Sequence, residues 1–347
     1  MTSISALAIA NPEFTVFRQD IPSVAQLWLG DDPEAKSRYL RLVQNAGVER
    51  RFFALDPAKI LSLNGMKYRS ELFHQLGIPL LGSVMKEAID NANIESSEIT
   101  SVIHSSCSVP AIPSVDGAAI SSIGISPRVK RIPMYQQGCA GGVVGLALAS
   151  RLAKLGAPVL VTSLELCSLV FQPENHSGTE LVGAALFADG AAAAVVSPES
   201  GRCSIVDTES YLLPNTRDLM GYDIFDDGFY LRLDRALPQV LSANAPSIIE
   251  TFLSRHNLTR ESIDYWLFHP GGIRILDFFE ENLNLHAEQC HWSREVLKNY
   301  GNMSSATILF VLNEFMKSKV LAKGEHALVV GVGPGLTVEL ILLEGLN

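Results

Sequence analysis

The sequence predicts a layered α/β fold, and three observations support this prediction. Short apolar runs rich in β-branched residues alternate along the chain with longer stretches of helical periodicity. Hydrophobic residues make up 47% and charged residues 18% of the 347 residues, a balance that fills a large core and leaves no room for extended disorder. No repeat with a period of about 20 to 50 residues is present, which excludes solenoids and propellers. Alternating strands and helices of this kind pack in layers around a sheet.

The expected elements follow from length and residue type. Strands are expected where short runs are apolar and rich in β-branched or aromatic residues, at 101–104, 159–162, 192–196, 265–268, 326–332 and 337–343. Helices are expected at 33–48, 80–91, 142–155, 246–256 and 305–318. The length corresponds to about two units of about 150 residues. A turn cluster at 197–201 near the midpoint therefore predicts two halves, 1–200 and 201–347.

Charge and hydropathy exclude two classes of protein. The 27 Lys and Arg residues against 37 Asp and Glu give a net charge of −10, whereas a nucleic-acid binder needs a basic footprint. Asp189 and the sequence Gly333-Pro334-Gly335 interrupt the longest apolar stretches before about 20 residues, so no membrane span is expected. Residues 1–5 lack the basic start and apolar run of a signal peptide, which predicts a cytoplasmic protein.

The cysteines indicate neither a disulfide framework nor a structural metal. They are odd in number and include no CxxC pair: Cys107, Cys139, Cys167, Cys203 and Cys290. Each cysteine is therefore either a buried residue that packs in the core or a reactive thiol. His286, Cys290 and His291 are close in sequence but lack a second ligand pair, so we interpret them as a surface turn and predict no metal site.

Cys139 is the first candidate for catalysis. It lies in Tyr135-Gln-Gln-Gly-Cys-Ala-Gly-Gly142, directly before the small, apolar, helix-prone run 143–155. Unpaired N–H groups at a helix N-terminus favour thiolate over thiol, and glycines let a carbonyl approach backbone donors. A buried structural cysteine in a tight turn is the alternative, because free cysteines are often buried.

Two further polar residues also stand at element ends. His269 follows the aromatic run 265–268 and precedes Pro270-Gly271-Gly272, a stiff turn that would fix an imidazole; an ordinary polar strand end is the alternative. Asn302 lies in a polar turn before the apolar helix 308–316, where a turn or cap residue is the common use of Asn. Together, Cys, His and Asn supply the nucleophile, base and hydrogen-bond donors that acyl transfer through a thioester requires.

In these motifs the chain resembles the type III polyketide synthases, the chalcone-synthase-like branch of the thiolase superfamily. Five blocks in family order carry the resemblance: 135–139 (YQQGC), 186–192 (LFADGAA), 268–277 (FHPGG with ILD), 301–305 (GNMSS) and 333–339 (GPGLTVE). The resemblance implies the thiolase fold, in which two similar halves form five layers, α-β-α-β-α, as a homodimer. It also implies a buried site reached by a pantetheine tunnel.

The resemblance assigns roles to the three candidates. Cys139 is expected to attack an acyl thioester and to hold the starter. His269 is expected to keep Cys139 anionic and, with Asn302, to hydrogen-bond the thioester oxygen while malonyl decarboxylation generates an enolate. A Claisen condensation follows. Loss of carbon dioxide drives it, so no metal or redox cofactor is expected.

Pocket residues follow from the same resemblance. Phe187 matches a gatekeeper phenylalanine between tunnel and cavity, although a core aromatic is the alternative. The second gatekeeper position falls on Leu231, a departure that implies a differently shaped entrance. Cys107, Val170 and Ser304 complete the expected substrate-binding set, and the apolar side chains of Val170, Phe171 and Leu231 suggest an aliphatic acyl starter.

Arg38 and Arg41 fall where family members bind the coenzyme A phosphates, for which paired arginine donors are suited. At Asn45 family members have a further cation, which this chain lacks, so delivery of the acyl group by an acyl carrier protein stays open. A solvated basic helix face without a binding role is the alternative. Ile112-Pro113 falls where the family passes a residue into the neighbouring subunit's cavity.

The expected reaction is therefore decarboxylative condensation of acyl and malonyl thioesters, with release of a pyrone, resorcinol or phloroglucinol-type product. One alternative is a stand-alone ketosynthase that condenses chains on acyl carrier proteins, as in the initiating synthases of fatty acid synthesis. A non-catalytic partner that retains the fold is another, which the intact triad disfavours.

Overall fold

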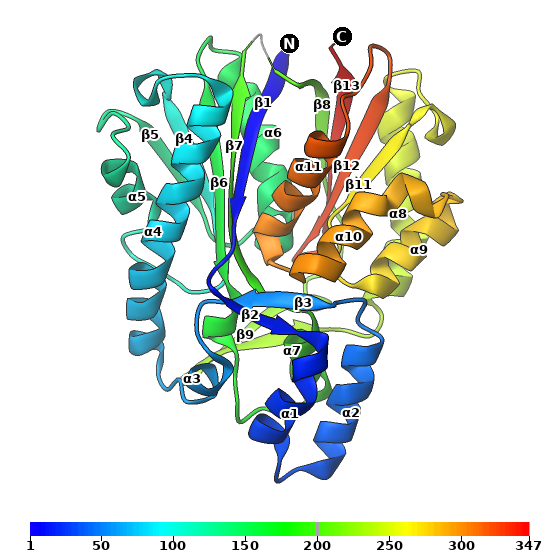
Figure 1. The fold of residues 1–347 in the computed structure, drawn as a ribbon. Coiled ribbons are helices and arrows are strands. Elements are labelled where there is room, and N and C mark those ends of the chain that lie inside the picture. The colour runs from blue at the N-terminus through cyan, green and yellow to red at the C-terminus, as the bar shows by residue number, and fades with distance from the viewer. Residues whose placement is uncertain (199–200, 347) are drawn as a thin grey trace.

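The computed structural model describes residues 1–198 and 201–346. Within these residues one mixed sheet has nine strands in the order β11-β12-β13-β8-β1-β7-β6-β4-β5 (Figure 1). The bounds are β1 (Thr2–Ala10), β4 (Ser101–Ser105), β5 (Lys130–Met134), β6 (Val159–Leu166), β7 (Asp189–Ser197), β8 (Cys203–Leu212), β11 (Tyr265–Phe268), β12 (His326–Gly333) and β13 (Thr337–Gly345). β4 pairs in parallel with β5 and β6, and β11 with β12, while the other pairings are antiparallel.

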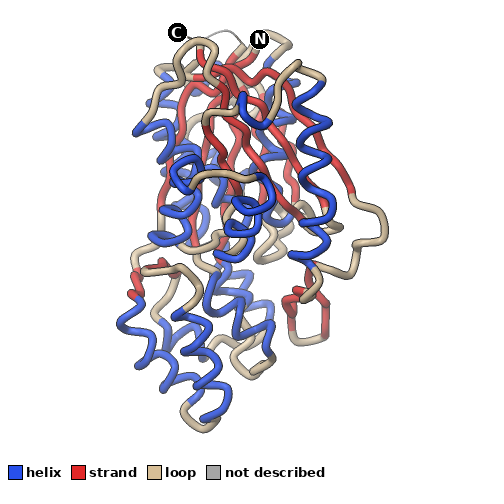
Figure 2. Tube along the Cα trace, turned by 90° about the vertical axis from the view of Figure 1, so that its right-hand side faces the viewer, coloured by secondary structure: helices blue, strands red, loops and turns tan. Residues whose placement is uncertain are grey.

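Helices cover both parts of this sheet and also lie between them, as Figures 1 and 2 show. α4 (Met66–Ala92) and α5 (Asp116–Ser122) cover one outer side, and α8 (Leu237–Ser254) and α9 (Ile273–Leu283) cover the other. α6 (Gly141–Ala153) and α11 (Thr307–Ser318) pack between β4–β7 and β8–β13 and share one buried cluster with both sets of strands. The order is α-β-α-β-α, as the thiolase fold predicts.

A smaller layer of elements lies beneath the end of the sheet at the bottom of Figure 1, opposite the two chain ends. It contains the strand pairs β2 (Phe14–Phe17) with β3 (Arg50–Phe53) and β9 (Met220–Phe225) with β10 (Gly228–Leu233). Its helices are α1 (Ile21–Leu29), α2 (Pro33–Gln44), α3 (Pro57–Leu61) and α7 (Gly178–Leu186). N-cap residues stabilise the starts of α2 and α7. The side chain of Asp32 accepts a hydrogen bond from the N–H of Ala35, and that of Ser177 accepts one from the N–H of Glu180.

The predicted strands are all present, whereas two helix starts were wrong. α4 begins at Met66 and not at residue 80, and α8 begins at Leu237 and not at residue 246. Both predictions placed the start beside a proline, yet Pro79 and Pro246 lie inside the helices. An interior proline costs one hydrogen bond and bends the axis, and here the buried face of each helix offsets that cost. α10 (His291–Tyr300), α1, α7 and the strand β1 were not predicted at all.

The predicted boundary at 197–201 falls between β7 and β8, and residues 199 and 200 lie outside the described part of the chain. The division into halves 1–200 and 201–347 stays a prediction. β1 pairs with both β7 and β8 and so joins the two parts of the sheet. Over residues 1–198 and 201–346, no helix is both long and apolar enough to cross a bilayer.

Candidate active site

Cys139 lies in a single turn of 3-10 helix, Gly138–Ala140, that leads directly into α6. The residue before it, Gly138, has φ +52°, and a Cβ there would lie 2.6 Å from Cδ of Pro334, so only glycine fits without a shift. Cys139 is half-buried as a residue. The sequence prediction of a cysteine at a helix N-terminus is confirmed.

His269 directly follows β11, and its backbone N–H donates to the carbonyl of Val330 at 2.8 Å. Its side chain is 4% exposed, and neither ring nitrogen has a hydrogen-bond partner within the described residues. Burial lowers the pKa of His269 to about 4, so the ring is neutral at pH 7. A buried imidazole with both nitrogens unpaired is unusual and fits a group that meets a substrate.

Asn302 is held by its backbone and its side chain together. Its N–H donates to Leu186 O and its carbonyl accepts from Ala188 N, both at 2.9 Å, which fastens it beside Phe187. The side-chain oxygen accepts from the N–H of Ser304 at 2.9 Å and from the hydroxyl of Thr307 at 3.3 Å. These two donors fix the amide orientation and turn the NH2 group toward Gly271, whose carbonyl it meets at 3.3 Å. One amide hydrogen remains for a ligand.

Ser304 connects the three predicted catalytic residues. Its hydroxyl lies 3.6 Å from Sγ of Cys139 and 3.1 Å from Sγ of Cys107, and its N–H bonds Asn302. Asn302 in turn bonds Gly271, which is hydrogen-bonded to the carbonyl of His269 at 3.0 Å. Ser304 has φ +46°, a conformation that is uncommon outside glycine and typical of functional sites. We call Cys139, His269, Asn302 and Ser304 the polar cradle.

A buried glutamate beneath the polar cradle was not predicted. Glu165 of β6 is completely buried and accepts hydrogen bonds from the N–H groups of Cys107 and Ser108 and from the hydroxyl of Ser305. Burial raises its pKa, and its charge raises the pKa of Cys107 further above the value that burial produces. A lone acidic residue within an apolar strand was the available signal. Cys107, expected to line a pocket, lies against Ser304 instead.

Burial acts against the expected thiolate–imidazolium pair. It raises the pKa of Cys139 to about 11 and lowers the pKa of His269 to about 4, so each group on its own is neutral near pH 7. Besides burial, the hydroxyl of Ser304 lowers the pKa of Cys139, and the charge of Glu165 raises it. A pair of charges would exist here only if their mutual attraction exceeds both desolvation costs. The ion pair therefore stays a prediction.

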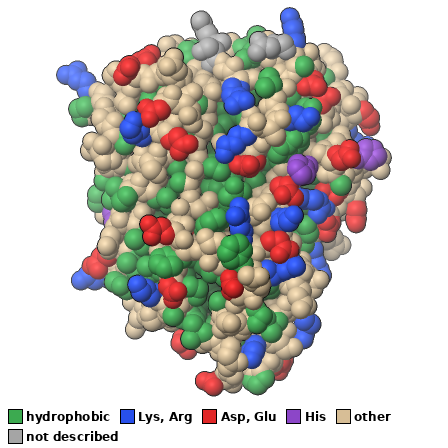
Figure 3. Space-filling model, in the orientation of Figure 1, with side chains coloured by type: hydrophobic (Ala, Val, Ile, Leu, Met, Phe, Trp, Pro, Cys, Tyr) green, Lys and Arg blue, Asp and Glu red, His purple; other side chains and the backbone are tan. Residues whose placement is uncertain are grey.

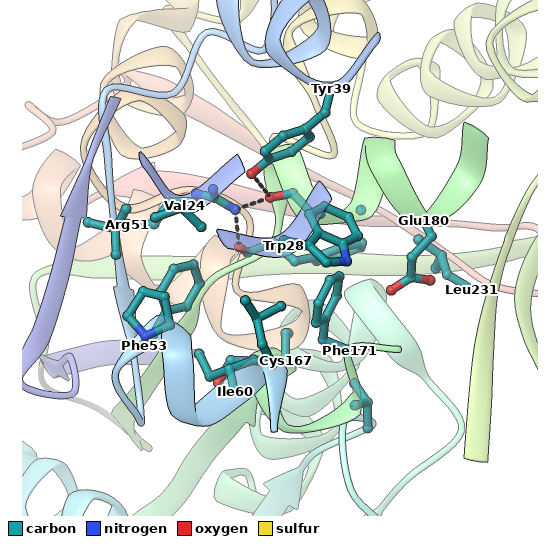
Figure 4. Close-up of a pocket in the computed structure, with 18 of the residues that line it drawn as sticks. Val24, Trp28, Tyr39, Arg51, Phe53, Ile60, Cys167, Phe171, Glu180 and Leu231 are labelled. Atoms are coloured by element: carbon teal, nitrogen blue, oxygen red, sulfur yellow. Dashed lines mark hydrogen bonds between the residues drawn. The ribbon is translucent and has the colours of Figure 1, made fainter. Parts of the chain in front are cut away.

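A cavity of about 100 Å³ opens beneath α1, and we call it the α1 pocket (Figure 4). Its wall is mostly apolar and aromatic, and it includes Ile21, Val24, Trp28, Ile60, Phe171 and Phe229. Three of the predicted substrate-binding residues, Val170, Phe187 and Leu231, also line it. Cys107 and Ser304 do not, so the predicted substrate-binding set divides between this pocket and the polar cradle.

The α1 pocket adjoins the polar cradle. Phe187 lines the pocket and forms a β-bridge with Asn302, and Tyr222 and Cys167 lie on the same wall. Arg51, also on the wall, donates hydrogen bonds to the carbonyls of Ala184 and Phe187 and so fixes the chain beside Asn302. Sequence reasoning missed Arg51 and Tyr222, because nothing near them in the sequence marks a site.

Arg38 and Arg41 lie on α2, at the edge of the lower layer. Neither forms an ion pair with a carboxylate in the described part of the chain; Arg41 donates to Ser37 Oγ at 2.6 Å, and Arg38 lies beside Gly178 at the start of α7. Asn45 caps α2 by donating to Arg41 O at 2.8 Å. No group of three or more His, Cys, Asp or Glu side chains within residues 1–198 and 201–346 is arranged to hold a metal ion.

Comparison with known proteins agrees with this geometry. The model of the N-terminal domain of chalcone and stilbene synthases matches residues 2–200, and that of their C-terminal domain matches residues 204–347. The 1,3,6,8-tetrahydroxynaphthalene synthase of Streptomyces griseus is 30% identical over 342 residues, which cover 98% of this chain and 91% of that protein. The phloroglucinol synthase of Pseudomonas fluorescens is 30% identical and covers 88% of both chains.

Solved structures support the same assignment. The crystal structure of 1,3,6,8-tetrahydroxynaphthalene synthase from Streptomyces coelicolor, a bacterial type III polyketide synthase, superimposes with a TM-score of 0.94 at 28% identity, over 99% of both chains. The initiating ketosynthases of fatty acid synthesis and a non-catalytic partner, the two alternatives from the sequence, are therefore not favoured. The chain belongs to the chalcone and stilbene synthase family and is a type III polyketide synthase, an acyltransferase that condenses malonyl units with loss of carbon dioxide.

Proposed function

We propose that Cys139 carries the starter acyl group of this polyketide synthase. Its sulfur attacks the carbonyl carbon of an acyl thioester, the new sulfur–carbon bond forms, and the thiol of the carrier leaves with the proton that Cys139 gave up. The support is positional: Cys139 lies directly before α6 and is linked through Ser304 to Asn302.

His269 and Asn302 then act on the malonyl thioester. Decarboxylation breaks the bond to the carboxylate, carbon dioxide leaves, and the electron pair forms an enolate whose oxygen carries the charge. The free amide hydrogen of Asn302 and one N–H of His269 hydrogen-bond that oxygen, an interaction strongest where charge develops. The enolate carbon attacks the acyl carbon on Cys139 and expels its sulfur. The observation that carries this proposal is the buried His269 ring with both nitrogens unpaired.

We further propose that the acyl and malonyl groups arrive as coenzyme A thioesters. Arg38 and Arg41, which have no carboxylate partner in the described ion pairs, are suited to the phosphates of the carrier. On the face in Figure 3, basic and acidic side chains are interspersed, and no continuous basic patch of the kind an acidic carrier protein needs is present there. Phe187 and Leu231, which the resemblance expects between tunnel and cavity, both line the α1 pocket.

The products and the assembly follow from the family. Two relatives are named for aromatic products, tetrahydroxynaphthalene and phloroglucinol, which supports release of a cyclised pyrone, resorcinol or phloroglucinol-type product here. A homodimer is proposed because the resemblance leads us to expect that the loop with Ile112 enters the neighbouring subunit, and Ile112 is 98% exposed. The cytoplasmic location stays a prediction.

The function is tested by incubation of the protein with 13C-labelled malonyl-coenzyme A and a panel of acyl-coenzyme A starters, with mass analysis of the products. We expect labelled carbon dioxide and chains extended by two-carbon units. Cys139→Ala should still release carbon dioxide while forming no starter-derived product. Absence of decarboxylation with every starter would contradict the proposed function. Turnover with carrier-protein thioesters alone would contradict the proposal that the acyl and malonyl groups arrive as coenzyme A thioesters.

A further inference from the structure

Three polar groups on the wall of the α1 pocket are satisfied by the protein itself. The indole N–H of Trp28 donates to Pro173 O at 2.7 Å, and the hydroxyl of Tyr39 donates to Ala184 O at 3.3 Å. Ser168 donates to the buried carboxylate of Asp189. Within the described residues, the wall groups without a hydrogen-bond partner include one oxygen of Glu180, the Tyr222 hydroxyl, the Cys167 thiol, and Nε and Nη2 of Arg51.

Glu180 is buried at a helix position where a glutamate normally forms a capping box. It is the third residue after the N-cap Ser177, the position from which a capping-box glutamate bonds back to the N-cap N–H. Here Asn175 accepts that N–H at 3.0 Å instead. Oε1 of Glu180 accepts from the N–H of Gln172 at 3.2 Å, and the side chain is 6% exposed. Figure 4 shows its carboxylate directed into the pocket between Phe171 and Leu231.

The second carboxylate oxygen of Glu180 has no protein donor and is open to the pocket, so a ligand that displaces water there must supply a donor. Arg69 is 2% exposed, donates to the carbonyls of Leu169, Phe171 and Leu63, and attracts Glu180 electrostatically. This fixed positive charge disfavours an ammonium group in the same place. Burial raises the pKa of Glu180 to about 7, so its charge is only partly developed at neutral pH, and a neutral donor fits best. A hydroxyl group is such a donor.

The dimensions and the rest of the wall define the body of the ligand. A cavity of about 100 Å³ holds about three water-sized groups at about 30 Å³ each, so it has room for the end of an acyl chain. Val24, Ile60 and Leu231 give the wall an aliphatic character along this length. Phe187, which is bridged to Asn302, marks the end of the pocket nearest the polar cradle, and Glu180 lies in the first turn of α7, at the opposite end of that helix.

We infer that the α1 pocket binds the tail of an aliphatic acyl starter that carries a hydroxyl group near its distal end, and that Glu180 accepts the hydrogen bond of this hydroxyl. The inference rests on the proposed function, because the carbonyl end of the same chain is held on Cys139. It makes Glu180 a specificity-determining residue.

The test compares 10-hydroxydecanoyl-coenzyme A with undecanoyl-coenzyme A, in which a methyl group replaces the hydroxyl. The ratio of their kcat/KM values in condensation with malonyl-coenzyme A is measured for the full chain. We expect the wild-type protein to favour the hydroxyacyl ester by about 10- to 100-fold, the effect of one hydrogen bond to a charged group. In Glu180→Leu the ratio should fall to one or below, and Glu180→Gln, which keeps an acceptor, should retain part of the preference.

Glu339→Gln is the matched control. Glu339 is another buried glutamate whose pKa burial raises to about 7, and it bonds Ser210 away from the pocket, so the ratio should stay at the wild-type value. A wild-type ratio near one, or a ratio that Glu180→Leu leaves unchanged, overturns the inference. If Glu180→Leu does not fold, the wild-type ratio and Glu180→Gln decide. Acetyl-coenzyme A, whose acyl group is too short to reach Glu180, separates the two proposals. If acetyl-coenzyme A is turned over but the hydroxyacyl ester is not preferred, only the inference about Glu180 is overturned. If no ester is turned over, the proposed function itself is contradicted.

Discussion

The polar cradle and the α1 pocket adjoin each other but are built in opposite ways. In the polar cradle the side chain of Asn302 is fixed by three hydrogen bonds, to Ser304, Thr307 and Gly271. In the α1 pocket shape comes from side chains of many elements, and a carboxylate oxygen of Glu180 is left for a ligand. We therefore propose that the cradle sets the chemistry and that the pocket sets the choice of starter. Changes in the cradle should therefore lower rates with every starter, and changes in the pocket should alter ratios between starters.

The largest effect is expected from His269→Ala. Loss of the imidazole should lower kcat for decarboxylation and condensation by about 10²- to 10³-fold, because the ring acts on charge that develops in the transition state. Loading of the starter should fall much less. Single-turnover measurement of loading and of carbon dioxide release separates the two effects.

His104 offers the matched control for this variant. It is also fully buried with a pKa that burial lowers to about 4, but it bonds Thr162 inside the sheet. His104→Asn should leave kcat within a few-fold of wild type. Equal losses of loading and decarboxylation in His269→Ala would instead indicate a structural histidine.

A bulky residue in the α1 pocket should change selectivity. Val24→Trp fills the cavity beneath α1, so the kcat/KM for a C10 starter relative to acetyl-coenzyme A should fall about tenfold or more. Leu27→Trp on the same helix is the control, because Leu27 is 58% exposed and does not line the pocket. Equal losses for long and short starters would show that the pocket does not hold the chain.

Removal of the two arginines on α2 should have a smaller effect. Arg38→Ala with Arg41→Ala should raise KM for coenzyme A esters by about 3- to 10-fold, as expected for exposed charge contacts. N-acetylcysteamine esters lack the phosphates and should be unaffected. Lys36→Ala, on the same helix and bonded to Gln26, is the control. A KM increase for both kinds of ester would place the arginines outside the carrier site.

The pH dependence of Cys139 alkylation decides the charge state of the cradle. Burial raises the pKa of Cys139 to about 11, so the thiolate fraction in the empty enzyme, and with it the rate with iodoacetamide, should still be rising above pH 9. A rate already constant near pH 7 would establish the Cys139–His269 ion pair expected from the sequence. Serine in place of Cys107 isolates the signal of Cys139, because the two thiols share Ser304.

The same contrast explains what could be predicted from the sequence. Cys139, His269 and Asn302 each lie at the end of a helix or strand, beside glycines. Two of these glycines have a positive φ that other residues rarely adopt: Gly138 with φ +52° and Gly301 with φ +74°. Such local constraints leave motifs. Glu165, Arg51 and Glu180 act through partners more than five residues away, so no motif marks them. The starts of α4 and α8 were wrong for a related reason, since long-range burial outweighs a local proline signal.

The central claim is that Cys139 carries the starter. It is tested most directly by the intact mass of the protein after incubation with acyl-coenzyme A esters in the absence of malonyl-coenzyme A, beside Cys139→Ala and Cys107→Ala. The account predicts one acyl adduct on the wild-type chain and on Cys107→Ala, and none on Cys139→Ala. An adduct that persists in Cys139→Ala and disappears in Cys107→Ala would contradict it.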